Sequence, residues 1–302
     1  MRKVAVATTG FFDGVHAGHR HIIDSLVSLA RKRGDEAVVV TFWPHPRTVL
    51  QNGARELRLL SSLEEKKRIL YSLGVDRVEV LDFSRDFAAL TAGRYIREVL
   101  VGRLGVSAVV VGYDNRVGSD LCSGEDLRKE CLDAGVECFL LDSVSFRGNL
   151  VVSSTIIRRS LESGDVREAG SMLCAPYGLY GVVVAGNRLG RQMGYPTANM
   201  QLYEPLKLIP ANGVYAVDVD VLGRKYMGMC NIGVRPTVGG GARTVETHIL
   251  DFNQDIYGLP IGISFVSRIR PERKFPGLEA LKQQLFRDEA AVRSIMEGKT
   301  AP

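Results

Sequence analysis

The sequence predicts two domains of different class: a doubly wound parallel α/β sheet, followed by a small all-β barrel with a terminal helix. In the first half, strand-like apolar runs alternate with helical patterns, which is typical of a parallel sheet covered by helices. In most of the second half, short strand-like runs alternate with glycine-rich turns, which favours a barrel. The chain of 302 residues is also long for a single core. We therefore predict domains at residues 1–177 and 178–302.

Composition excludes several classes of protein. Hydrophobic residues make up 45% of the chain and charged residues 24%, which indicates a globular protein rather than a disordered one. No apolar run reaches the roughly eighteen residues of a membrane span, and the first residues are too few for a signal peptide. The net charge of +5 includes no long Lys/Arg block, so we expect neither nucleic-acid nor membrane partners. Weak self-association is left open.

Cysteine usage indicates a reducing compartment. The 5 cysteines are an odd number and include no Cys-x-x-Cys pair, so we expect free thiols and a cytoplasmic protein. Cys131, Cys138 and Cys174 sit in apolar patterns and are expected to be small core residues.

The first domain is expected to alternate strand and helix throughout. The expected strands are 4–7, 37–42, 75–83, 106–111 and 136–141, and the expected helices are 20–32, 63–73, 91–104 and 125–134. Ser62 and Glu65 have the spacing of a capping box at a helix start. Because ligands bind at the carboxyl ends of parallel strands, segments 10–19, 43–47 and 112–116 are expected on one rim of the sheet.

The segment TTGFFDGVHAGH, residues 8–19, follows the first strand and opens the first helix. A helix N-terminus has unsatisfied N–H groups and attracts phosphate, and Gly14 and Gly18 let a ligand approach the backbone. Three residues apart, His16 and His19 lie on one face of the first turn and can hydrogen-bond a phosphate. Ordinary surface histidines and a zinc site are the alternatives, but no local third ligand completes a zinc site.

Two further segments offer groups for an anionic ligand. Prolines stiffen the loop 43–47, where His45 and Arg47 are candidate donors; a purely structural turn is equally compatible with the composition. Near residue 153 three hydroxyls and an arginine stand at a helix start, which makes a second anion site or a simple N-cap. These residues are Ser153, Ser154, Thr155 and Arg158.

The second domain is expected to contain five strands and a closing helix. The expected strands are 181–185, 213–221, 225–232, 244–252 and 261–269, and the helix is 277–297. We expect four apolar side chains of this helix to face inward. They are Leu278, Leu281, Leu285 and Val292.

Two parts of the second domain carry candidate chemistry. The oxygens of Thr197 and Asn199 are suitable Mg²⁺ ligands beside nucleotide phosphates, although such residues also simply hold turns. Glu246 alternates with His248 and Leu250 along a strand. We expect Glu246 to point inward among apolar neighbours, where a carboxylate is costly unless it has a function or forms a salt bridge.

These segments resemble those of a known family. FFDGVHAGH resembles the His-x-Gly-His signature of the nucleotidyltransferase superfamily, in the form found in bacterial bifunctional riboflavin kinase/FAD synthetases. FWPHPR, GYDNRVG and SSTIIR are similar to further elements of that family, and GRQMGYPTAN closely resembles its riboflavin kinase signature, all in family order. The chain departs from the family at Asn115 and Val117, which replace aromatic residues, and at Ile156, where many members have Arg.

The resemblance implies that the barrel phosphorylates riboflavin to FMN with MgATP, and that the α/β domain adenylylates FMN to FAD with a second ATP, releasing pyrophosphate. It implies that Glu246 is the general base, that Thr197 and Asn199 hold Mg²⁺, and that His16 and His19 stabilise developing charge. The implied nucleotide or phosphate contacts are Gly10, Phe11, Asp13, Gly18, Ser153, Ser154, Thr155, Arg158, Gly190 and Arg191. The implied flavin contacts are His45, Arg47, Asp114, Asn115 and Arg116.

Three alternatives stay open at this point. One is a riboflavin kinase with a weak or lost adenylyltransferase activity, suggested by Asn115, Val117 and Ile156. Another is a nucleotidyltransferase that acts on a different phosphate ester. The third is a flavin-binding or regulatory module without turnover, against which the set of Thr197, Asn199 and Glu246 argues.

Overall fold

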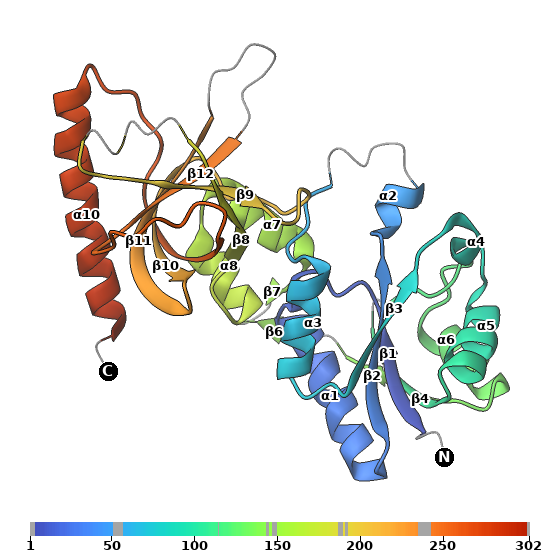
Figure 1. The fold of residues 1–302 in the computed structure, drawn as a ribbon. Coiled ribbons are helices and arrows are strands. Elements are labelled where there is room, and N and C mark those ends of the chain that lie inside the picture. Colours follow the sequence, from blue (N-terminus) through green and yellow to red (C-terminus); the bar gives the residue numbers. More distant parts are fainter. Residues whose placement is uncertain are drawn as a thin grey trace. The chain divides into compact units, whose positions relative to one another are not determined.

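The structure is a computed structural model that describes residues 4–50, 57–113, 115–142, 145–146, 150–186, 190, 193–234 and 243–300. The chain divides after Ser154 into two compact units. The first unit contains a parallel sheet with helices, and the second contains a closed barrel and a long terminal helix (Figure 1). The predicted fold class is therefore confirmed. Among the described residues, no helix is both long and apolar enough to cross a membrane.

Five strands of the first unit form one parallel sheet in the order β3-β2-β1-β4-β5. They are β1 (Ala5–Thr9), β2 (Glu36–Trp43), β3 (Arg77–Asp82), β4 (Val106–Gly112) and β5 (Glu137–Leu141). The chain winds from β1 outward to β3 and then returns to the other side of β1 with β4. The carboxyl ends of β1 and β4 therefore form the topological switch point, where ligands bind in sheets of this kind.

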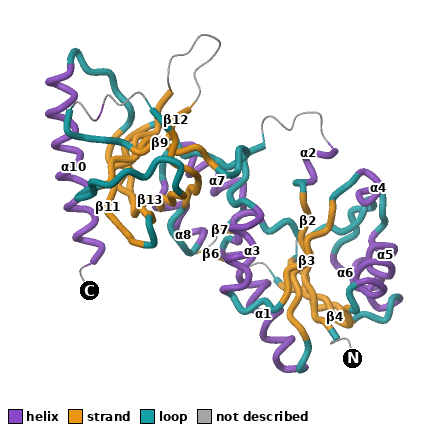
Figure 2. The backbone as a smooth tube through the Cα atoms, in the orientation of Figure 1, coloured by secondary structure: helices purple, strands orange, loops and turns teal. Residues whose placement is uncertain are grey.

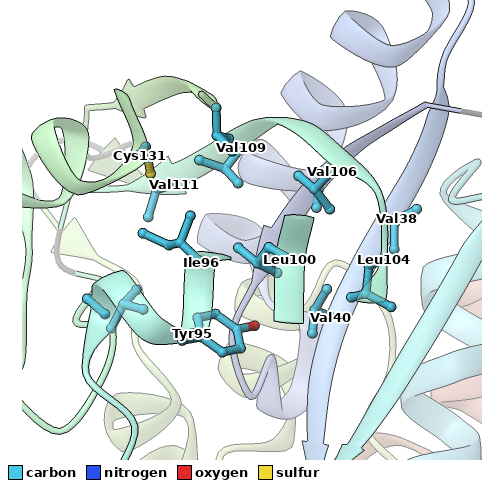
Figure 3. Close-up of a cluster of buried hydrophobic side chains, with 14 of the residues drawn as sticks. Val38, Val40, Tyr95, Ile96, Leu100, Leu104, Val106, Val109, Val111 and Cys131 are labelled. Carbon is cyan, nitrogen blue, oxygen red and sulfur yellow. The ribbon is translucent and has the colours of Figure 1, made fainter. Parts of the chain in front are cut away.

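Helices cover both faces of this sheet (Figure 2). On one face lie α1 (Ala17–Arg33) and α3 (Leu63–Ser72). On the other face lie a π-helix, η3 (Tyr95–Arg103), and α6 (Gly124–Asp133). Side chains of β2 alternate between the two cores, as the pleat of a strand requires: Val39 packs with the first pair of helices, and Val38 and Val40 pack with the second (Figure 3).

Several short elements were not predicted, because each is too short to show a periodicity. They are η1 (Asp13–Val15), α2 (Pro46–Leu50), α4 (Arg85–Ala88) and the hairpin strands β6 (Ser145–Phe146) and β7 (Leu150–Val151).

The helix predicted at 91–104 includes α5 (Ala92–Arg94). It is divided between α5 and η3. The π-helix begins with Tyr95, whose buried hydroxyl is 2.8 Å from Thr9 Oγ1 at the end of β1.

The second unit begins with the helices α7 (Ser154–Ser163) and α8 (Val166–Leu173). Its closed barrel has the order β10-β11-β12-β9-β8-β13, and β10 pairs with both β11 and β13. The strands are β8 (Gly178–Val184), β9 (Ala198–Leu202), β10 (Gly213–Val221), β11 (Arg224–Val234), β12 (Arg243–Ile249) and β13 (Pro260–Arg270). Helix α8 packs on β13, and the predicted domain boundary at residue 177 stays a prediction.

The terminal helix α10 (Leu278–Thr300) packs on the outside of β10, β11 and β13. Val292 and Met296 are buried there with Val214 and Met229. Leu278 was expected to face inward, but its side chain is 64% exposed, because it is the first residue of the helix and extends beyond the strands. Cys174 is likewise exposed and not a core residue, because it ends α8 in a left-handed conformation with φ of 57°.

The capping box predicted at Ser62 is confirmed: Ser62 Oγ accepts from the Glu65 amide at 3.2 Å, and Glu65 Oε2 accepts from the Ser62 amide at 2.7 Å. We expect Ser62→Ala to lower the unfolding free energy of the first unit by about 1 kcal/mol, the usual contribution of an N-cap. Trp43, the single tryptophan, ends β2 and reports urea unfolding of this unit by fluorescence.

Ser72→Ala is the matched control, since Ser72 is exposed at the end of the same helix and donates to the Ile69 carbonyl. An equal loss of stability in both variants would contradict the assigned role of the cap.

Candidate functional site

The loop after β1 adopts a conformation that is uncommon for its residues. Phe12, Gly14 and Val15 have φ angles of 54°, 78° and 42°. Left-handed φ is costly for residues with a Cβ, especially a β-branched one, and such strain persists only where the surroundings enforce it. The loop leads into α1 at the switch point of the sheet, so its location is that of a ligand site.

Asp13 is one of the groups that enforce this conformation. Its carboxylate is 4% exposed and accepts hydrogen bonds from the Leu60 amide at 3.0 Å and the Ser61 amide at 3.1 Å. The Gly14 amide in turn donates to Ser61 Oγ at 3.0 Å. The sequence predicted Asp13 as a nucleotide contact. Because its carboxylate is committed to the backbone of residues 60–61, we assign it to holding the loop.

The two histidines of the motif lie together at the start of α1. The rings of His16 and His19 stack with centroids 3.7 Å apart and an interplanar angle of 17°. Burial lowers the pKa of His19 well below its usual value, and the neighbouring charges of His16 and Lys66 lower it further. Nδ1 of His19 is buried and has no hydrogen-bond partner among the described residues. At neutral pH His19 is therefore a neutral imidazole with spare hydrogen-bonding capacity.

Both predicted glycines of this motif lie against aromatic rings. A Cβ at Gly18 would lie 3.4 Å from the His16 ring, and a Cβ at Gly10 would lie 3.1 Å from the Phe12 ring. Side chains at these positions would crowd the histidine and the turn. Their contribution here is close packing, which leaves the histidines in place.

Lys66 belongs to this site and was missed by the sequence reasoning. Its side chain is fully buried, and Nζ donates to the Phe11 carbonyl at 2.5 Å. Nζ also lies 3.7 Å from the centroid of the Phe11 ring. A signal was available: Lys66 precedes Ile69 and Leu70 by three and four positions, so it stands on the apolar face of its helix.

The loop after β2 lies beside the motif. The His45 ring is 4.1 Å from the Phe11 ring, centroid to centroid, in an edge-on arrangement. His45 Nδ1 accepts from the Arg47 amide at 3.0 Å, which fixes the ring within its own turn. The Arg47 side chain is exposed. The structure thus brings His45 to the predicted rim and leaves the Arg47 guanidinium in solvent.

The loop after β4 meets the same rim. Asn115 Nδ2 donates to the Thr9 carbonyl at 2.8 Å, which ties this loop to the end of β1. Asn115 is the residue that replaces a family aromatic, and its amide is used to hold the neighbouring strand. Arg116 is exposed. Asp114 lies outside the described residues.

The residues predicted as a second anion site, within 153–158, lie in two different parts of the structure. Ser154 Oγ donates to the Asp13 carbonyl at 3.1 Å, so Ser154 lies at the loop that precedes α1. Ser153 precedes it, half-buried. Thr155 and Arg158 belong to the body of α7, in the second unit. Their contact with a nucleotide stays a prediction.

In the second unit, strand register assembles a row of polar side chains. Glu246 of β12 pairs with Asn231 of β11 on one side and with Asn199 of β9 on the other. Residues directly opposite each other in antiparallel strands project to the same face, about 5 Å apart at Cβ. The structure therefore brings the predicted base, Glu246, next to the predicted metal ligand, Asn199. The strand β9 that carries Asn199 was not predicted.

The expected orientation of Glu246 is corrected by the structure. The neighbouring residue Thr247 points into the barrel, where it packs near the Val217 and Val219 side chains around Gly228. Because successive residues of a strand face opposite ways, Glu246 projects outward from the barrel. It is half-buried and lines a cavity rather than the barrel interior.

Two cavities of about 310 Å³ each meet at Thr197. The first cavity is lined by the strands around Glu246 and by Leu281 and Leu285 of α10. The second cavity lies on the other side of Thr197 and is lined by residues 252–257 together with Thr247 and Ile249. Both volumes are in the range of small-molecule pockets. The arrangement can hold two molecules with their ends close together at Thr197.

Two contacts that the sequence did not reveal shape the first cavity. His248 Nδ1 donates to the Pro196 carbonyl at 2.8 Å, which anchors the segment that carries Thr197. Arg270 lines the cavity, and its Nε and Nη2 atoms donate to the carboxylate of Asp288 of α10, whose side chain is 1% exposed. The partners lie far apart in the sequence, so no local pattern predicts them.

Two glycines leave space for the side chains of Asn199 and Thr197. A Cβ at Gly186 would lie 2.2 Å from Asn199 Nδ2 and 2.8 Å from Asn199 Oδ1, so the amide occupies the space that a side chain would fill. A Cβ at Gly190 would lie 2.2 Å from the Tyr195 carbonyl and 3.6 Å from Thr197 Cγ2. Arg191 lies outside the described residues.

Comparisons with known proteins cover both units. Models described as FAD synthetase and riboflavin kinase match residues 1–156 and 173–296, respectively. A bifunctional riboflavin kinase/FMN adenylyltransferase from Bacillus subtilis is 35% identical over 94% of this chain and 90% of its own length. One from Escherichia coli is 39% identical over 98% of this chain and 94% of its own length.

A solved structure matches the whole chain as well. It is described as a macrolide-efflux protein from Streptococcus pneumoniae, and it has a TM-score of 0.90 and 36% sequence identity over 97% of this chain and 95% of that chain. Two family models match successive parts of the chain, and relatives above 30% identity match nearly its full length. The chain belongs to the family of bifunctional riboflavin kinase/FMN adenylyltransferases.

Proposed function

We propose that the barrel unit transfers the γ-phosphoryl group of ATP to the 5′-hydroxyl of riboflavin, and that the sheet unit transfers the AMP part of a second ATP to FMN. The observation that carries the proposal is the position of Thr197, which lies between two cavities and beside the paired residues Glu246 and Asn199. A phosphoryl transfer needs this geometry, in which donor and acceptor approach end to end.

In the kinase reaction we assign the cavity under α10 to riboflavin and the cavity formed by residues 252–257 to ATP. The first cavity has aliphatic walls from Leu281 and Leu285 for an apolar ring system, and it contains Glu246. Glu246 accepts the proton of the ribityl hydroxyl as its oxygen forms a bond to the γ-phosphorus, while the bond between that phosphorus and the β-phosphate oxygen breaks. His248 keeps Thr197 in place through the Pro196 carbonyl.

The residues at the junction fit a magnesium ion bound together with ATP. Mg²⁺ prefers oxygen ligands and keeps several waters, so two neutral protein oxygens suffice beside phosphate groups. Thr197 and Asn199 offer such oxygens, and Gly186 leaves space for the Asn199 amide. When bound, Mg²⁺ would neutralise charge on the phosphates.

In the adenylyltransferase reaction a phosphate oxygen of FMN attacks the α-phosphorus of ATP, and pyrophosphate leaves as the bond to the β-phosphate oxygen breaks. The N-terminus of α1 and the loop before it supply backbone N–H groups for the phosphates. His16 and His19 lie there, and the lowered pKa of His19 keeps it neutral and able to donate a hydrogen bond to the developing charge. No covalent enzyme intermediate is needed.

For the flavin of FMN we keep His45 and the loop after β4 as the candidate surroundings. His45 is supported by its place against Phe11 at the motif. Asn115 is proposed to hold the end of β1, since its amide already donates to the Thr9 carbonyl. Arg47 and Arg116 are exposed, and we propose them as attracting charges for the phosphates.

A cytoplasmic location is part of this proposal, supported by 5 free cysteines.

A riboflavin kinase with weak adenylyltransferase activity is the second candidate. It is favoured by Asn115 and Val117, which stand where the family has aromatic side chains. Chromatography of the products from riboflavin and MgATP separates the two: FAD formation supports the bifunctional proposal, and accumulation of FMN without FAD supports the second candidate. The absence of both products would contradict either.

The two activities are expected to separate genetically. Glu246→Gln removes the proton acceptor and is expected to abolish FMN formation while FMN is still converted to FAD. His19→Ala is expected to do the reverse, with a loss in adenylyltransferase kcat of about 100- to 1000-fold, as for other preorganised donors. Product assays started from riboflavin and from FMN check both, and loss of both activities in one folded variant would contradict the two-site proposal.

Gly186→Ala tests the place of Asn199. The added methyl group would collide with the amide of Asn199, so we expect a large loss of kinase activity, a weaker dependence on Mg²⁺ and an unchanged adenylyltransferase. Gly277→Ala is the control, because a Cβ there would meet open space. Full kinase activity in Gly186→Ala would remove the support for Asn199 as a metal ligand.

A further inference from the structure

A buried lysine lies behind the loop of the adenylyltransferase site, with no role assigned to it so far. Lys66 is fully buried, and a buried ammonium group costs free energy through desolvation. A side chain of methionine or leucine would fill the same place on the apolar face of α3 without that cost. The charge of Lys66 therefore calls for a functional explanation.

We propose that Lys66 is a positioning residue for adenylyl transfer, whose ammonium group fixes the Phe11 carbonyl and places a positive charge behind the phosphate loop. This inference rests on the proposed function of the first unit. Lys66 does not reach substrate itself, since its side chain is fully buried. It acts through the peptide group that joins Phe11 to Phe12.

The contacts of Nζ converge on the segment before the histidine motif. Nζ donates to the Phe11 carbonyl at 2.5 Å and to Thr41 Oγ1 at 3.3 Å, and it lies 3.7 Å from the centroid of the Phe11 ring. The Phe11 ring in turn contacts the His45 ring. One cation thus holds both the backbone and the side chain of Phe11 at the point where β1 turns into the strained loop.

The carbonyl does not need Lys66 merely to be satisfied. Thr41 Oγ1 also donates to the Phe11 carbonyl, at 3.2 Å. Removing the ammonium group would therefore leave this buried acceptor with a hydrogen-bond partner, and no orphaned polar group would penalise folding. What would be lost is the charge, and a charge-assisted hydrogen bond polarises the peptide that it contacts more strongly than a hydroxyl does.

The charged groups around Lys66 are consistent with such a role. Burial lowers the pKa of Lys66 to about 8, and the Asp13 carboxylate opposes this shift. Lys66 in turn lowers the pKa of His19, after burial and His16. A charge on Lys66 and a charge on His19 repel each other. The ammonium form of Lys66 therefore favours the neutral form of His19.

The test compares Lys66→Met with Lys67→Met in the full chain. Methionine keeps the length and apolar stem of lysine without the charge. Lys67 is the next residue of the same helix, is partly exposed and pairs with Glu64 at 3.1 Å, so its replacement is the matched control. Both variants and the wild type are assayed for FMN formation, for FAD formation from FMN with kcat and KM separated, and for urea unfolding by Trp43 fluorescence.

We expect Lys66→Met to lower kcat for FAD formation by about tenfold or more, because one charge-assisted hydrogen bond contributes about 1.5–3 kcal/mol, with a smaller change in KM for FMN. Kinase activity is expected to be unchanged, and stability unchanged or higher because the desolvated charge is gone. Lys67→Met is expected to match the wild type in all assays. Unchanged FAD formation in Lys66→Met would overturn the inference, as would a loss of FAD formation that is accompanied by a loss of stability.

The pH profile gives a second readout. If the ammonium form is required, kcat/KM of the wild type for FAD formation falls as the pH rises through about 8, the folded pKa of Lys66. We expect Lys67→Met to show the same fall in kcat/KM above about pH 8. The residual activity of Lys66→Met is expected not to fall there. If kcat/KM of Lys66→Met fell in the same way, the inference would be overturned. A wild type without any FAD formation would instead contradict the proposed function.

Discussion

The first unit depends on holding one strained loop open to a ligand at the end of a buried strand. Phe12 and Val15 have positive φ angles there, and hydrogen-bonding groups from distant parts of the chain help to hold the loop in this conformation. Residues 60 and 61 hold Asp13, the hydroxyl of Ser154 holds its carbonyl, and Lys66 and Thr41 hold Phe11. The Asp13 carboxylate, the Asp13 carbonyl and the Phe11 carbonyl are thus hydrogen-bonded within the protein, next to the N-terminus of α1, where phosphate binding is proposed.

In the second unit, the pairing of barrel strands places the candidate site residues. There the constraint is register: the closed barrel fixes which residues stand opposite each other, and a shift by one residue would turn Glu246 toward the barrel interior. Helix α10 packs on that side of the barrel, where Leu281 and Leu285 line the cavity and Arg270 forms an ion pair with Asp288. The candidate site residues are thus placed by a strained loop in the first unit and by strand pairing in the second.

The sequence was sufficient for what is local and periodic. The strands of the parallel sheet, the helix α1 and the capping box at Ser62 follow from spacing, and the motif strings led to His16, His19, Glu246, Thr197 and Asn199. The sequence was insufficient wherever the position of a side chain depends on a tertiary contact. The commitment of Asp13 to residues 60–61, the outward direction of Glu246 and the pair of Arg270 with Asp288 depend on segments that are distant in the chain. Lys66 falls between these two cases. The sequence shows that it stands on the apolar face of its helix, but not that its ammonium group contacts the Phe11 carbonyl.

The place of Thr197 in the wall between two cavities has a kinetic consequence. Under the proposed function, each substrate occupies a cavity of its own, and the two cavities share Thr197. Neither cavity would then have to be filled before the other, so the proposed assignment does not impose a fixed order of substrate addition.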